Sequence, residues 1–362
     1  RNWSSTAASP QCSAAALAPA SADRHNAGLE YRGTYGESIM ATEHRLTSAP
    51  ENLRWGAFSA DFEAVLEVES GDRVVIETIS GGPDQIPEEV RDSLLPDHAA
   101  FIADNKPILP GHIMTGPVAV RGAVPGDVLE VRIIDVELRQ DWAWNMIMPL
   151  KGSLPEDFHK KRVLNIPLDR EAHVAKLPWG VDLPCNAFFG VMGVSPPPEW
   201  GTITSIVPQP HGGNLDIKEL GAGSTLYLPV HVPGANFQTG DGHALQGDGE
   251  SCLSAAETAL IGTFEFHLRQ DLSYKMPRAE TDTHYITIGI DQDLDDAAKQ
   301  GLRDMIVLIQ ERTNLSAEDA YSLCSLAADV RVSQLVNINK GCHVMLPKAA
   351  LHGAADAAGK RL

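Results

Sequence analysis

Residues 118–138, VAVRGAVPGDVLEVRIIDVEL, predict two β-strands joined by a turn. Pro125-Gly126-Asp127 is a typical turn sequence, because proline presets one backbone angle and glycine tolerates positive φ. From Val128 to Leu138 apolar and polar side chains alternate, as they do in a strand with one buried face. This stretch therefore favours a sheet-rich fold.

The same pattern recurs along the chain. Alternation over 65–69 and an apolar run over 74–79 flank the turn Ser70-Gly71-Asp72. Later strands are expected at 186–194, 202–207, 225–232, 261–268 and 284–290. The 24 prolines and 31 glycines fit a β protein with many turns.

The C-terminal part predicts helices. Leu302, Met305, Ile306 and Ile309 recur at helical spacing within 293–312. A second helix is expected after Ser316, where Ser-Ala-Glu-Asp resembles a capping box. We therefore expect a mainly β, β-sandwich-like body with appended C-terminal α-helices, α+β overall.

Composition excludes some functions. The chain of 362 residues has a formal net charge of -19 and no dense basic patch, which argues against nucleic-acid binding. No apolar run approaches the roughly 20 residues that span a bilayer, so no membrane segment is expected. We interpret 1–39, rich in Ala and Ser, as an extension or leader, 40–350 as the folded domain in one unit or two interlocked subdomains, and 351–362 as a tail.

The five cysteines are scattered and form no CxxC pair: Cys12, Cys185, Cys252, Cys324 and Cys342. Reduced thiols and a cytoplasmic location are expected. Cys252 lies close to Glu250 and could serve as a nucleophile, but its small-residue surroundings favour a packing role.

The most informative motif is GDGHALQGDGE at 240–250, which we expect to be a loop. Asp241 and His243 are ligands suited to zinc or a similar divalent cation. Glu250 is placed to act as a general base. An acidic turn without function and an oxygen-only calcium loop are the alternatives.

Two further ligands are proposed from local context. His112 stands in a Pro-Gly loop that enters a strand, where it could bind a metal or simply form a loop hydrogen bond. Asp135 shares strand parity with Leu129, Val131 and Ile133, so its carboxylate is expected on the buried face and in need of a partner. Alternatively, Asp135 ends its strand and reaches solvent.

A loop that could line the site starts at His211 and ends at Asp216, HGGNLD. Its paired glycines and clustered polar groups are typical of a site-lining loop, and equally of a plain turn.

Several motifs together resemble the acetamidase/formamidase family. They are GGNLD at 212–216, GSTLYLPVHVPGA at 223–235, the 240–250 motif, TGPV at 115–118, PGDVL at 125–129 and FFGVMGV at 188–194. The likeness covers about residues 42 to 350. Asn236-Phe237-Gln238-Thr239 departs from the small or aliphatic residues common there, which leaves the substrate open.

The resemblance implies hydrolysis of short aliphatic amides such as formamide or acetamide, a zinc-type centre and a homo-oligomer. We assign the cation to His112, Asp241 and His243, with Asp135 as a further ligand, and proton transfer to Glu250. Calcium is the alternative cation. His211 and Asp216 are expected to contact substrate, and Phe188, Phe189 and Met192 to select short acyl groups. Hydrolysis of a γ-lactam, carbamate or ester, and non-catalytic calcium and carbohydrate binding, are the alternative functions.

Overall fold

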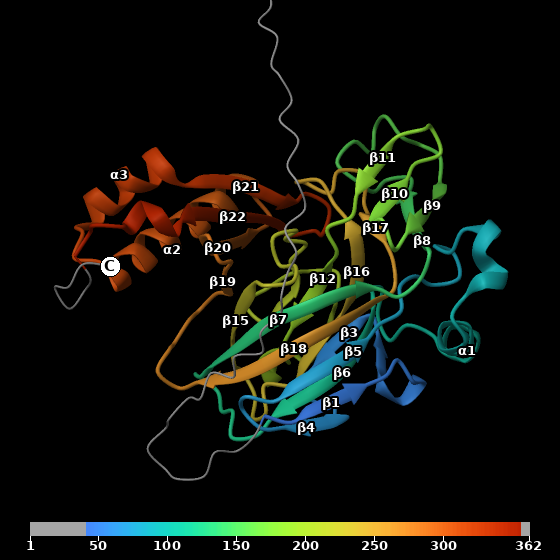
Figure 1. Cartoon of the computed structure of the whole chain (residues 1–362), viewed down its shortest axis with the longest axis horizontal. Coiled ribbons are helices and arrows are strands. Elements are labelled where there is room, and N and C mark those ends of the chain that lie inside the picture. The colour runs from blue at the N-terminus through green and yellow to red at the C-terminus, as the bar shows by residue number, and fades with distance from the viewer. Residues whose placement is uncertain (1–40, 356–362) are drawn as a thin grey trace, which may run out of the picture. The chain divides into compact units, whose positions relative to one another are not determined.

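The computed structural model describes residues 41–355 (Figure 1). The expected extension at 1–39 and the end of the expected tail, 356–362, lie outside these residues. No helix in the described part is long and apolar enough to cross a membrane.

Most of residues 41–355 lie in two large β-sheets. The nine-stranded sheet has the order β1 (Glu43–Leu46), β5 (Arg73–Glu77), β18 (Leu260–Arg269), β7 (Val128–Leu138), β15 (Thr225–Pro229), β19 (Arg278–Glu280), β20 (His284–Asp291), β22 (Lys340–Pro347), β21 (Asp329–Gln334). The main path of the eleven-stranded sheet is β11 (Asp182–Pro184), β10 (Val174–Lys176), β9 (Arg162–Asp169), β8 (Trp142–Ile147), β17 (Ala256–Glu257), β16 (Phe237–Leu245), β12 (Phe188–Gly193), β14 (Gly212–Asn214).

Three strands extend the second sheet beside this path. β6 (Ile113–Val120) pairs with β16 and carries β2 (Leu53–Trp55) and β4 (Leu66–Val68). A separate ribbon joins β3 (Ala57–Ser59) to β13 (Thr202–Thr204). Short 3₁₀ turns lie at Pro50–Asn52, Glu88–Ser93, Pro198–Trp200 and Lys348–Leu351.

The main hydrophobic core lies between the two large sheets. Phe264 of β18 packs 5.4 Å from Phe189 of β12 and 5.6 Å from Phe237 of β16, measured between ring centroids. These aromatic rings are almost wholly buried, so each stabilises the fold by roughly 1.5–3 kcal/mol relative to exposure. Contact between the inner faces of two sheets confirms the predicted sandwich-like body.

The C-terminal helices form a second, smaller core. α2 (Leu294–Arg312) packs on β20 and β22, and α3 (Ala317–Ala327) packs on α2 (Figure 1). The side chain of Asp293 caps α2. Ser316 Oγ accepts from Asp319 N at the start of α3, as the sequence predicts. A third helix, α1 (Pro96–Asp104), was not expected from the sequence.

The structure corrects the prediction for Asp135. β7 and β18 pair in register up to Ile133, opposite Phe264, and resume at Asp135, opposite Thr263. Ile134 is therefore an extra residue, a β-bulge, which inverts the alternation of side chains beyond it. Asp135 is exposed, and the local Val136 N–H, at 2.9 Å, is the one donor to its carboxylate among the residues that the structure describes.

The first half of the 240–250 motif is also not a loop. Residues 237–245 form β16, which pairs with β6, β12 and β17. Glycine permits these close approaches: a Cβ on Gly240 would lie 2.3 Å from Ile113 O, and one on Gly242 2.5 Å from Thr258 O. The glycines therefore serve strand packing, and only residues 246–250 turn away from the sheet.

Candidate active site

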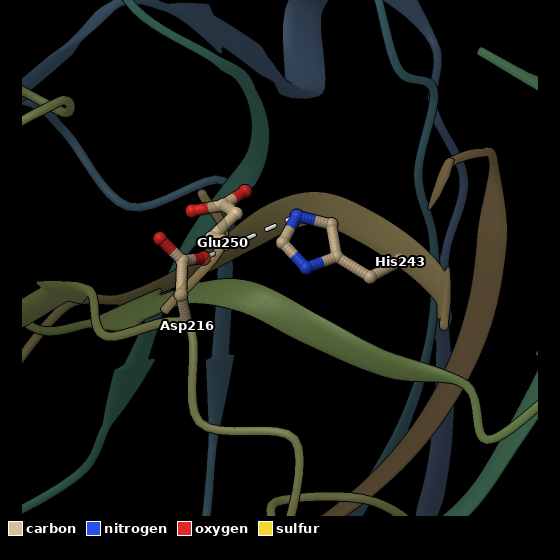
Figure 2. A group of neighbouring side chains, drawn as sticks. All are labelled: Asp216, His243 and Glu250. Carbon is tan, nitrogen blue, oxygen red and sulfur yellow. Dashed lines mark ion pairs between the residues drawn. The ribbon is translucent and has the colours of Figure 1, made fainter. Parts of the chain in front are cut away.

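Four buried carboxylates surround the buried imidazole of His243. His243 Nε2 lies 3.2 Å from Glu257 Oε2, 3.3 Å from Asp241 Oδ2 and 4.0 Å from Asp216 Oδ1. The fourth acid is Glu250, which with Asp216 and His243 offers donor atoms within 4.8 Å of one another. Figure 2 shows the carboxylates of Asp216 and Glu250 side by side, facing the His243 ring. None of the five side chains is more than 7% exposed.

The eleven-stranded sheet positions these groups. Asp241 and His243 are two residues apart on β16, so their side chains share a face. Glu257 of β17 lies directly opposite His243 in the strand register. Asp216 follows β14, and Glu250 lies in the turn after β16, which brings both to the same point.

Three of the acids have left-handed backbones. The φ angle is 49° at Asp216, 54° at Asp241 and 45° at Glu250. Such conformations cost of order 1–3 kcal/mol each and concentrate at functional sites. The fold therefore holds these carboxylates in orientations that the local chain would not adopt alone.

Gly190 of β12 leaves the space into which the acids converge. A Cβ at this position would lie 2.4 Å from Asp216 Oδ1, 2.6 Å from Asp241 Oδ2 and 2.7 Å from His243 Cε1. Any larger side chain would therefore occupy the centre of the cluster.

Burial and mutual repulsion perturb the acids. Burial, with the Asp241 charge added, raises the pKa of Glu257 to about 8. Burial and then the Asp216 charge raise the pKa of Glu250 well above its usual range. Burial alone would lower the pKa of His243, but the Glu257 and Asp241 carboxylates outweigh it and raise that pKa.

Asp241 differs from the other acids. Burial opposes its ionisation, yet the neighbouring His112 and His243 hold its pKa below the usual value. Burial raises the pKa of Asp216, partly offset by His243. Pairs of titratable groups with opposed shifts are typical of sites that hold cations or move protons.

The chemistry of the cluster fits a divalent cation. Four buried atoms that could ligate one have no hydrogen-bond partner within residues 41–355: Asp216 Oδ1, Glu250 Oε2, Glu257 Oε2 and His243 Nε2. Four carboxylates facing one imidazole leave excess negative charge, which is costly in a buried site without a compensating cation. Carboxylate oxygens with imidazole nitrogen are a common donor set for such ions.

His112 reaches the edge of this cluster. It immediately precedes β6, and its Nε2 lies 3.7 Å from Asp241 Oδ2. Its Nδ1 lies 3.2 Å from Ser205 Oγ, which also accepts the His112 backbone N–H. His112 is only half-buried, so it stands between the acid cluster and solvent.

The structure separates the predicted substrate-contacting residues. Phe188 meets His243 edge-on, with ring centroids 4.9 Å apart. Phe189 and Met192 instead lie in the main core between the sheets.

His211 is buried in an aromatic setting, 4.9 Å from the Phe58 ring. Burial, with the nearby His231, lowers its pKa to about 3, so it is a neutral imidazole. Asp216, predicted as a substrate contact, instead lies within the acid cluster. Cys252 accepts a hydrogen bond from Asn145 Nδ2 at 3.2 Å and is half-buried.

Two neighbours of the site histidines were not identified from the sequence: Glu257, beside His243, and Ser205, beside His112. Glu257 is the single acid in the apolar stretch 255–260, and this isolation is the signal that could have identified it. Ser205 carries no such signal, because only the tertiary fold brings it to His112.

Comparisons with known proteins point to one family. The profile of the Acetamidase/Formamidase family matches residues 43–204 and 199–352. A putative formamidase of Schizosaccharomyces pombe is 29% identical over 46% of this chain and 55% of its own, so this chain spans about half the length of that relative.

Solved structures extend the likeness. The acetamidase of Bacillus halodurans is 33% identical, with a TM-score of 0.73 over 84% of this chain and 97% of its own. A γ-lactamase of Delftia acidovorans shares the fold, at 23% identity and a TM-score of 0.55 over 88% of this chain and 96% of its own.

Proposed function

The chain belongs to the acetamidase/formamidase family, and on that basis we propose that it hydrolyses short aliphatic amides to a carboxylate and ammonia. Formamide and acetamide are the proposed substrates. The observation that carries the proposal is the buried cluster of four acids around His243, because it combines a cation-binding donor set with groups able to hold protons.

We propose that Asp216, Asp241, His243 and Glu257 hold a divalent cation, with His112 at the exposed edge. When bound, such a cation supplies a Lewis acid that polarises the amide carbonyl and lowers the pKa of water. The imidazole of His243 favours zinc over calcium, which prefers oxygen ligands alone. Asp135, an exposed residue after the bulge, is not among the proposed ligands.

Glu250 is the proposed proton carrier. Burial and the Asp216 charge raise its pKa, which makes the carboxylate a stronger proton acceptor, and the amide nitrogen needs a proton before it can leave. Its left-handed backbone and buried position fix the carboxyl beside Asp216. The same group can accept a proton from water in the first step and return it to nitrogen in the second.

Phe188 excludes water from one side of the site. Its ring is fully buried and covers the His243 imidazole edge-on. Removing water from the cluster strengthens the electrostatic interactions within it.

Two alternatives are weighed against this proposal. Hydrolysis of a γ-lactam, carbamate or ester would use the same groups, and a substrate panel separates it. Non-catalytic calcium and carbohydrate binding requires both histidines to lie away from the ion, whereas His243 is at the centre of the acids.

A homo-oligomer and a cytoplasmic location remain predictions. The four cysteines within residues 41–355 are free thiols, as a reducing compartment favours. Light scattering on the purified full chain would give the oligomeric state.

The proposal is tested by metal analysis and ammonia release on the same preparation. We expect at least one zinc-type ion per chain and loss of amidase activity with a chelator. The rate of ammonia release should fall by at least about 100-fold in Glu250→Gln. Glu137→Gln, on the exposed face of β7, is the matched control and should behave like the unmodified protein. Full activity in chelator, or in Glu250→Gln, would overturn the mechanism.

A further inference from the structure

The loop that follows β21, residues 335–339, is held in one shape by the side chain of Gln334. Gln334 Oε1 accepts from Val336 N at 2.8 Å and from Asn337 N at 3.0 Å. Gln334 Nε2 donates to Asn339 O at 2.8 Å. Gln334 is fully buried, so this short loop has a rigid base within the C-terminal part of the chain.

This loop presents Asn337 to the acid cluster. Asn337 Nδ2 donates to Asp216 Oδ2 and lies 3.4 Å from Asn214 O. The side chain is buried, so water does not compete for these contacts. An amide NH₂ is a donor only, and it is therefore complementary to an ionised carboxylate.

The hydrogen bond distinguishes the two oxygens of Asp216. Oδ2 accepts a hydrogen bond from Asn337, whereas Oδ1 has no hydrogen-bond partner among residues 41–355 and lies 4.0 Å from His243 Nε2. Figure 2 shows the Asp216 carboxylate directed at the His243 ring, with Glu250 beside it. Asn337 thus fixes the rotation of the carboxylate so that one oxygen faces the cluster.

The same segment also holds the turn that carries Glu250. Gly249 N donates to Ser333 O at 3.1 Å, and Leu335 N donates to Gly249 O at 3.0 Å. Residues 333–337 therefore attach to both loops that supply acids from outside the sheet. This contact gives the C-terminal α/β part of the fold a role at the site.

We propose that Asn337 is a positioning residue for the cation site, which it serves by orienting the carboxyl group of Asp216. The inference rests on the proposed function, since it assumes that Asp216 binds a cation. Groups that orient metal ligands in this way typically contribute 10–100-fold to metal affinity.

Asn339 offers a matched control in the same loop. Its Nδ2 donates to Pro208 O at 3.1 Å, so it also ties the loop to the body, but within the described part of the chain it forms no hydrogen bond with the four acids. The experiment compares Asn337→Leu, Asn337→Ala and Asn339→Leu in the full chain. Each protein is stripped of metal, checked by thermal unfolding and titrated with Zn²⁺ in a calorimeter.

We expect both Asn337 variants to remain folded and to bind Zn²⁺ about 10–100-fold more weakly, while Asn339→Leu binds it like the unmodified protein. With Co²⁺ as a probe, the visible spectrum should change for the Asn337 variants only. These results would support a positioning role, because a purely structural role for Asn337 would not produce them.

Four outcomes overturn the inference. Unchanged Zn²⁺ affinity in both Asn337 variants contradicts it and leaves the proposed function intact. If Zn²⁺ affinity falls equally in Asn339→Leu, Asn337 has a structural role. The same holds if both Asn337 variants unfold while Asn339→Leu stays folded. Absence of Zn²⁺ binding by the unmodified protein overturns the proposed function together with the inference.

Discussion

Replacement of Gly190 by alanine tests whether the acid cluster converges on one point. Gly190 has no positive φ, so the backbone of β12 accepts alanine without strain. The added Cβ would lie 2.4 Å from Asp216 Oδ1, 2.6 Å from Asp241 Oδ2 and 2.7 Å from His243 Cε1. Because ordinary non-bonded contacts begin at about 3.5 Å, these side chains must move away from the added Cβ by about 1 Å.

The displacement is large compared with what the proposed chemistry tolerates. Metal–ligand distances hold within about 0.2 Å, so a shift several times larger should abolish tight cation binding. A misplacement of about 1 Å at a reacting centre costs of order 100-fold in rate. We therefore expect Gly190→Ala to lose bound metal and at least about 99% of its amidase activity.

The assay pairs metal analysis with ammonia release from formamide and acetamide, and it includes thermal unfolding. Gly247→Ala is the control, because a Cβ there meets nothing within 4 Å and Gly247 precedes Glu250 in the same turn. It should retain metal and activity. Gly190→Ala with normal metal content and normal rates would refute a cluster built around this space.

Three further predictions follow from individual residues. Glu257→Gln should lower metal content and activity by at least about tenfold, measured by the same assays, whereas Glu171→Gln on the surface should not. Asp135→Asn should leave both unchanged, since the bulge exposes this side chain, whereas Asp241→Asn should reduce both; equal effects would contradict the assignment. The metal-free protein should become less stable from about pH 5 to pH 8. The folded pKa of Glu257 is raised to about 8, and the folded pKa values of Glu250 and His243 are raised as well. The folded state therefore binds more protons than the unfolded chain in this range, and its stability falls as pH rises. Unfolding temperatures across this range would show the fall, a saturating divalent cation should reduce it, and a rise with pH would contradict the shifts.

Much of the fold follows from local pattern. The strand from Val128 to Leu138 and the helix within 293–312 lie where periodicity predicts them, and the next helix begins after Ser316, where its cap residues predict it. Local side chains decide these features, because alternation sets a strand face and a cap satisfies its own helix. The family resemblance is likewise confirmed from motifs that lie in order along the chain.

Some residues of the candidate site can also be identified from the sequence. Asp241, His243 and Glu250 stand out among glycines, where bulky packing residues are scarce, and all three lie in the acid cluster. His112 reaches the edge of that cluster, as its loop position allows. Residue type and glycine context were sufficient for these four.

Tertiary structure alone decided the rest. The bulge at Ile134 arises from pairing with β18, so strand parity within one segment could not reveal that Asp135 is exposed. Glu257 lies at the site because its strand pairs in register with β16, and Asn337 because its loop, about 120 positions from Asp216, folds back onto that residue. No local sequence pattern encodes either contact. Local propensity fixes which elements form, whereas the sharing of a buried site depends on how sheets pair and pack across the whole chain.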